Sequence, residues 1–76
     1  MRGYSQSVIE ANQSASPNLG VTLGALLISL KYPVRAASAE LGVSRQTIYD
    51  WISGKAKPLE AKTIAIGELI NRLSAR

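Results

Sequence analysis

Cysteine and histidine are both absent from the sequence, and the two absences together exclude several kinds of site. No disulfide framework can form, a zinc site of the usual Cys/His kind is excluded, and so is histidine-based acid–base catalysis. The few carboxylates are scattered rather than paired, and no glycine-rich phosphate loop leads from a strand into a helix. We therefore expect no enzymatic activity, no metal, no cofactor and no small-molecule ligand.

Aromatic residues are scarce, with no phenylalanine and only three tyrosines and one tryptophan. The core must therefore consist mainly of Leu, Ile, Val and Ala, a mixture that suits packed helices better than a small sheet. With 76 residues, the chain has room for a single domain with a small core and a modest margin of stability.

The sequence also lacks a long apolar run. The longest stretch, residues 19–30, contains polar residues and is too short to span a bilayer, and the N-terminus does not resemble a secretion signal. We expect a cytoplasmic protein with no membrane partner. The formal net charge of +4, from nine Lys and Arg against five Asp and Glu, favours a polyanionic partner without specifying which one.

Apolar residues recur at helical spacing in residues 17–76, which predicts an all-α domain of four to five helices. The first helix is expected from about residue 17, capped by Ser16 or Asn18, up to residue 31 or 32. The second should run from 33 to 41, the third from 44 to 53, and the last from Pro58 to residue 73 or 74. Residues 1–16, rich in Ser, Gln and Asn, are expected to be a flexible N-terminal segment: a tail, a DNA-touching arm or a dimer arm.

The same spacing predicts which side chains are buried. Ile64 falls outside the expected stripes and should point outward, as a lone exposed residue or as part of a dimer surface. The residues expected to face inward are Leu19, Leu23, Leu26, Leu27, Leu30, Val34, Ala37, Leu41, Val43, Ile48, Trp51, Ile52, Leu59, Ile66, Leu69, Ile70 and Leu73.

Residues 34–52 meet the physical requirements of two short helices joined by a tight turn. Ser38 is small enough for the second helix to cross closely, and Gly42, four residues later, tolerates a positive φ. Leu41 and Val43 bracket the turn with apolar side chains, while residues 48 and 51 anchor the second helix inward. Meeting these requirements together is far more specific than meeting any one of them.

Residues 36–58 resemble the helix-turn-helix of the phage repressor and Cro family of transcription regulators, and a weaker similarity extends over roughly residues 20–73. The trailing Gly54-Lys55-Ala56-Lys57-Pro58 is similar to that family's exit from the recognition helix. Two departures stand out. Val34 lies where the family often has a phosphate-binding glutamine, and Ser38 replaces the usual alanine at the close crossing.

The resemblance implies a lambda repressor-like domain that places the helix at about 44–53 in the major groove of double-stranded DNA. It assigns base reading to Arg45, Gln46, Tyr49 and Asp50, and contacts with the DNA backbone to Ser44, Thr47, Lys55 and Lys57. Each of these residues also has a plainer interpretation as a solvated surface side chain. Arg35 and Lys62 are two further candidates for the DNA backbone.

The sequence leaves the biological role open between three classes. The first is a sequence-specific transcription regulator, a repressor from a phage or mobile element that binds palindromic DNA as a homodimer. The second is a helix-turn-helix subunit of an antitoxin, a recombination or excision factor, or a DNA-packaging machine. The third is a protein-interaction module that binds a partner helix and no DNA.

Overall fold

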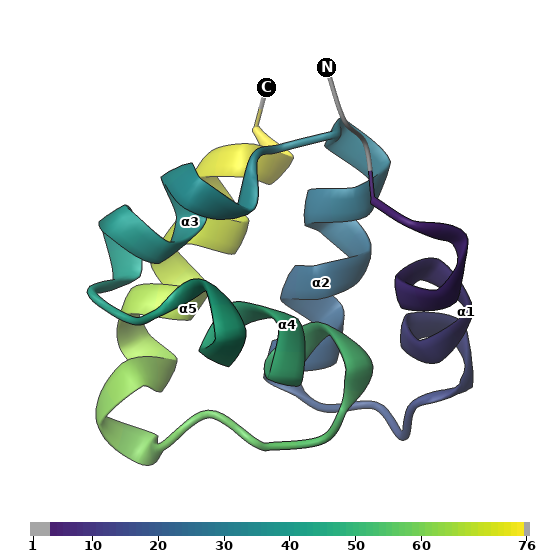
Figure 1. Cartoon of the computed structure of the whole chain (residues 1–76). Coiled ribbons are helices and arrows are strands. Elements are labelled where there is room, and N and C mark those ends of the chain that lie inside the picture. The colour runs from purple at the N-terminus through teal and green to yellow at the C-terminus, as the bar shows by residue number, and fades with distance from the viewer. Residues whose placement is uncertain (1–3, 76) are drawn as a thin grey trace.

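The computed structural model describes residues 4–75, which form a bundle of five α-helices with no strand among them (Figure 1). Helix α2 packs against α1, α4 and α5, and α3 packs against α4 and α5. This arrangement confirms the predicted all-α architecture. Within the described part of the chain, no helix is long and apolar enough to cross a membrane. The helices are α1 (Gln6–Ser14), α2 (Leu19–Leu30), α3 (Val34–Leu41), α4 (Arg45–Ser53) and α5 (Glu60–Ser74).

Three helices begin at polar side chains that accept a hydrogen bond from an otherwise unpaired backbone amide. Asn18 Oδ1 accepts from the amide of Val21 at 3.0 Å, and Ser44 Oγ accepts from the amide of Thr47 at 3.1 Å. Asn18 is one of the two residues expected to cap the helix that follows it. Ser5 caps α1 in the same way. Helix α5 begins at Glu60, two residues later than expected, because the backbone is still extended at Leu59.

Two helices end at glycines with positive φ, Gly42 (68°) after α3 and Gly54 (81°) after α4. Gly42 was predicted in this role because only glycine adopts the left-handed conformation without a steric cost. Helix α2 ends differently, at Lys31, whose φ is 55°. Lys31 is the one residue other than glycine with positive φ in the described chain.

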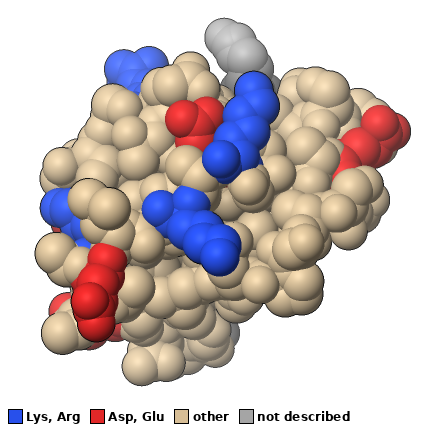
Figure 2. Space-filling model, turned by 90° about the horizontal axis from the view of Figure 1, so that it is seen from below, with Lys and Arg blue, Asp and Glu red and all other residues tan. Residues whose placement is uncertain are grey.

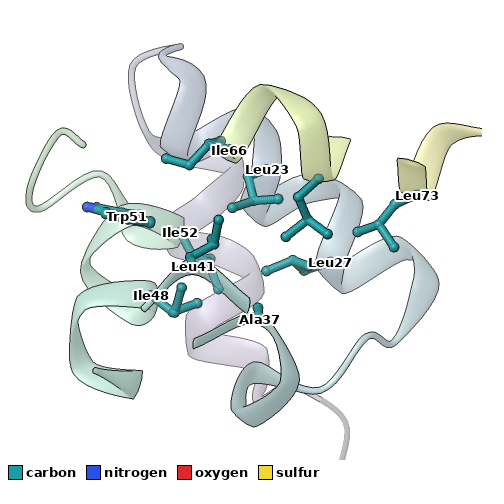
Figure 3. Close-up of a cluster of buried hydrophobic side chains, with 10 residues drawn as sticks. Leu23, Leu27, Ala37, Leu41, Ile48, Trp51, Ile52, Ile66 and Leu73 are labelled. Atoms are coloured by element: carbon teal, nitrogen blue, oxygen red, sulfur yellow. The ribbon is translucent and has the colours of Figure 1, made fainter. Parts of the chain in front are cut away.

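The core lies between α2, α3, α4 and α5 and is formed by hydrophobic side chains (Figure 3). Burial of Ile48, Trp51 and Ile52 confirms the predicted inner face of α4. The prediction was wrong for Leu59, which is 75% exposed because it precedes the first turn of α5, and for Leu30, which is exposed at the end of α2. The buried cluster consists of Leu23, Leu27, Ala37, Leu41, Ile48, Trp51, Ile52, Ile66, Leu69 and Leu73.

Helix α1 corrects the expectation of a flexible segment over residues 1–16, of which residues 1–3 lie outside the described chain. It packs against α2 and α4. Its anchor is Asn12, whose buried amide Nδ2 donates to the carbonyl oxygens of Val21 at 3.1 Å and of Ile52 at 2.9 Å. Because this helix is anchored by a polar side chain that binds main-chain atoms, its sequence does not show the apolar periodicity by which a helix is predicted.

Candidate nucleic-acid interface

The turn between α3 and α4 has the geometry that the sequence predicted. Gly42 carries the positive φ, and the next amide, of Val43, donates to the carbonyl of Ser38 at 3.1 Å. Leu41 is buried and Val43 packs against the core, so the turn is pinned on both sides of the glycine. The Ser38 hydroxyl donates to the carbonyl of Arg35 at 2.9 Å within α3, which satisfies this polar group at the crossing.

Helix α4 has two chemically different faces. Its inner face is fixed in the core by Ile48, Trp51 and Ile52. Its outer face carries the four residues predicted to read bases, so the structure brings this predicted set together. Three of the four are exposed and Asp50 is half-exposed: Arg45, Gln46, Tyr49 and Asp50.

Two of these side chains are already joined. The amide Nε2 of Gln46 donates to Oδ1 of Asp50 at 2.9 Å, one helical turn further along. The bond holds the Gln46 amide in one orientation while leaving its carbonyl oxygen and second N–H available. The pair can therefore present a fixed combination of donor and acceptor groups to a ligand.

The residues predicted to contact the DNA backbone lie around the ends of α4. The hydroxyls of Ser44 and Thr47 are 3.0 Å apart at its N-terminus. Lys55 and Lys57 are exposed in the segment that follows it, and Arg35 is exposed in the first turn of α3.

Lys62 differs from these residues because its ammonium is already bound within the protein. Its Nζ donates to the carbonyl oxygen of Leu41 at 2.8 Å, at the C-terminal end of α3. The bond joins α5 to the last turn before Gly42, where a cation is also favoured by the helix dipole. The side chain therefore has a structural partner in addition to the role predicted for it.

In the part of the chain that the structure describes, no carboxylate forms an ion pair with the cations near α4. Within residues 4–75, the ion pair is formed by Arg72 and Glu40, with 2.6 Å between Nη2 and Oε1. Figure 2 shows one face on which Lys and Arg side chains project near the centre, beside an acidic side chain, while most of the surrounding surface is uncharged. Unpaired cations of this kind are available to a polyanion.

Helix α1 flanks the outer face of α4, a neighbour that sequence reasoning missed. Ser7, Val8 and Ala11 line a shallow hollow opposite side chains of α4 and the segment after it. The sequence signals for α1 were weak: a serine before it and one apolar pair at residues 8–9. The α4 side of the hollow is formed by Gln46, Tyr49, Asp50, Ser53 and Lys55.

A chain of hydrogen bonds links the segment before α1 to the turn between α2 and α3, and continues to α3 and α5. The hydroxyl of Tyr4 donates to the carbonyl of Tyr32, and the hydroxyl of Tyr32 donates to Glu40, which also binds Arg72. Burial raises the pKa of Tyr4 to about 12, and nearby Tyr49 adds to the effect. The bond from Tyr32, with the charge and hydrogen bond of Arg72, holds the pKa of Glu40 below its usual value.

A family model described as helix-turn-helix matches residues 23–72, well over half of the chain. The matched residues include most of α2, all of α3 and α4 with the turn between them, and most of α5, and they leave α1 outside. No curated protein and no solved structure matches the chain.

Proposed function

Because the chain belongs to the helix-turn-helix family of the Cro and C1 type, whose members are DNA-binding regulators, we propose that it is a transcription regulator that binds specific sequences of double-stranded DNA. We further propose that it is a repressor from a phage or another mobile element. The observation that carries the proposal is the outer face of α4. It presents a guanidinium, an amide, a phenol and a carboxylate from a helix whose opposite face is locked in the core. Helix α4 enters the major groove, whose width admits an α-helix.

The chemistry of this face suits the edges of base pairs. Arg45 donates a bidentate pair to O6 and N7 of guanine, and Gln46 bonds to N6 and N7 of adenine. Asp50 accepts a hydrogen bond from the amino group of cytosine. This donor compensates for placing a negatively charged carboxylate next to DNA. Each good bidentate pair contributes about 1–3 kcal/mol of discrimination against a wrong base. The bond between Gln46 and Asp50 orients both groups before DNA arrives.

Contacts with phosphates supply affinity and set the register. Lys55, Lys57 and Arg35 extend toward the DNA strands on either side of α4, and the hydroxyls of Ser44 and Thr47 bind at its N-terminus. Lys62 reaches a phosphate with the N–H groups that Leu41 leaves free. Because each neutralised phosphate releases counterions, log K falls against log salt concentration by about 0.9 per contact.

The protein acts as a homodimer on a palindromic site, with the two copies of α4 about one helical turn of DNA apart. Ile64 on α5 supports a partner surface because 75% of its side chain is exposed. Gly67 lies one turn further along and a Cβ there would meet nothing within 4 Å, so a second copy has room to approach. Asn71 continues the same side of the helix.

The deciding experiment is selection of bound sequences from a pool of random duplexes by the full chain. We expect a symmetric consensus whose half-site spacing gives the dimer geometry. The matched test replaces Arg45, Gln46, Lys55 and Lys57 together by alanine, with Gln13→Ala at an exposed position on α1 as the control. Full duplex affinity in the fourfold variant would exclude the proposal. Selected sites at attachment or packaging sequences, instead of promoters, would assign the same DNA-binding surface to recombination or packaging.

A further inference from the structure

A second hollow adjoins the outer face of α4 and has a distinct chemical character. It lies between the start of α1, the turn from α2 to α3, and the start of α4. Its walls include three cations and three tyrosines, and none of its lining residues is acidic. The residues that matter here are Tyr4, Lys31, Tyr32, Arg35, Arg45 and Tyr49. We call this hollow the tyrosine groove.

The backbone of Lys31 is the first sign that the groove has a use. Lys31 ends α2 in the left-handed conformation, with φ of 55° and its amide bonded to the carbonyl of Ile28 at 3.1 Å. That conformation has a steric cost for any residue with a Cβ, and the other two left-handed helix ends in the described chain carry glycine. Glycine would close α2 equally well, so the fold does not require a lysine here. What lysine adds over glycine is a side-chain ammonium, which places a positive charge at the groove.

The tyrosines form a fixed wall. The ring of Tyr4 is held by its hydroxyl bond to the carbonyl of Tyr32, and Tyr32 is held in turn by its bond to Glu40. Both rings are only partly exposed, which suits them to shape the groove more than to stack on a free base. The groove is therefore preorganised, with its cations at the surface.

Position decides what the groove binds. Arg45 and Tyr49 belong both to this groove and to the outer face of α4, one helical turn apart. A ligand that lies along α4 therefore runs directly into the groove. When α4 lies in the major groove of duplex DNA, as proposed, that ligand is the sugar–phosphate backbone at one edge of the major groove.

Resting on that function, we propose that the tyrosine groove binds a phosphodiester group of duplex DNA, with Lys31 and Arg35 as its cationic ligands and Tyr4 as its wall. Charge complementarity supports this occupant, because the groove lining carries three positive charges and no negative one. Lys31 thus adds a DNA contact at the end of α2. Through Tyr4, the segment leading into α1 shapes the DNA-binding surface, although it lies outside residues 23–72.

Lys31→Gly tests the assignment because its effects on folding and on binding go in opposite directions. Removing the Cβ relieves the left-handed backbone, so the melting temperature should hold or rise. Removing the ammonium should weaken binding to the selected duplex several-fold and make the plot of log K against log salt concentration shallower by about 0.9. Lys31→Arg should keep both the affinity and the slope. Gln13→Glu, which lowers the net charge by one at an exposed position on α1 outside the groove, controls for net charge and should leave the slope unchanged.

Two results would overturn the assignment. In the first, Lys31→Gly keeps the affinity and the salt slope of the parent protein, while Gln46→Ala, which lies outside the groove, loses binding. The proposed function would then stand without a DNA contact at Lys31. If the variant with Arg45, Gln46, Lys55 and Lys57 all replaced by alanine also keeps full duplex affinity, the proposed function itself fails. The other is a larger loss for Lys31→Gly on a single-stranded thymidine oligonucleotide than on the duplex, which would identify the groove as a site for single-stranded nucleic acid.

Discussion

Asn12 in α1 donates a 2.9 Å hydrogen bond to the carbonyl oxygen of Ile52, in the last turn of α4. The same amide nitrogen donates to the carbonyl of Val21 in α2 at 3.1 Å, so one side chain joins three helices. Asn12 is the single buried polar residue in the described chain. Its contacts place the N-terminal helix against the end of the helix that carries the candidate DNA-reading residues.

Replacing Asn12 by alanine should destabilise the fold. The change removes both hydrogen bonds and leaves buried carbonyl oxygens with fewer donors, for an expected loss of about 1–3 kcal/mol in the free energy of unfolding. Urea unfolding followed by circular dichroism measures it. Gln13→Ala, at the exposed neighbouring position on α1, is the control and should stay within about 0.5 kcal/mol of the parent. Equal stability of the two variants would show that Asn12 is not the anchor.

Two glycines in helices should respond in opposite directions to alanine. A Cβ at Gly24 would lie 2.9 Å from Nδ2 of Asn12 and 2.9 Å from the backbone Cα of Ile52, so Gly24→Ala must push α1 and α4 away from α2. We expect a loss of about 1–3 kcal/mol. Gly67→Ala meets nothing within 4 Å and should gain up to about 1 kcal/mol from helix propensity. Thermal melts at low protein concentration compare the pair, and stabilisation by Gly24→Ala would contradict the close packing.

Stability should fall at alkaline pH through Tyr4. Its pKa is about 12 in the folded protein against an ordinary value of 10.0. Below pH 10 the phenol is neutral in both states and its contribution is complete. As pH rises from 10 toward 12, the unfolded chain ionises first, and the contribution is lost. Tyr4→Phe should therefore show a shallower decline than the parent over this window when unfolding is measured at a series of pH values. Parallel curves would mean that the phenol is not buried as described.

Asp50→Asn should change selectivity more than affinity. The substitution removes a negative charge from the face of α4, so binding to unrelated duplexes should strengthen, while discrimination at one base position should fall by about 1–3 kcal/mol. Competition binding against single-base variants of the selected site measures both effects. Asp50→Glu keeps the charge and serves as the control for the first effect. Unaltered discrimination at every position would remove Asp50 from the base-reading set.

Much of the helix-turn-helix was predictable because its determinants are local. Gly42 follows the last turn of α3, Ser44 caps α4, and the spacing of Ile48, Trp51 and Ile52 defines an inner face. The same spacing places the four candidate reading residues together on the opposite face. Rules that act within one or two helical turns are visible in a sequence.

The features that escaped prediction depend on contacts distant along the chain or on unfavoured backbone angles. Asn12 binds a carbonyl 40 residues away, and nothing in the residues around it indicates that partner. Lys31 adopts a φ that sequence rules assign to glycine. Lys62 shows the same limit within the candidate site, since the sequence made it a candidate for the DNA backbone and the fold supplies the Leu41 carbonyl as a partner.

The anchoring of α4 has a consequence for how this surface can change. Its hold on the rest of the protein comes from inward apolar side chains and, through Asn12, from a main-chain carbonyl. Neither depends on the identity of the outward side chains at positions 45, 46 and 50. Target preference can therefore be rewritten, by mutation or by engineering, while the scaffold stays unaltered. A library randomised at those three positions should consist largely of folded proteins that differ in the duplexes they select.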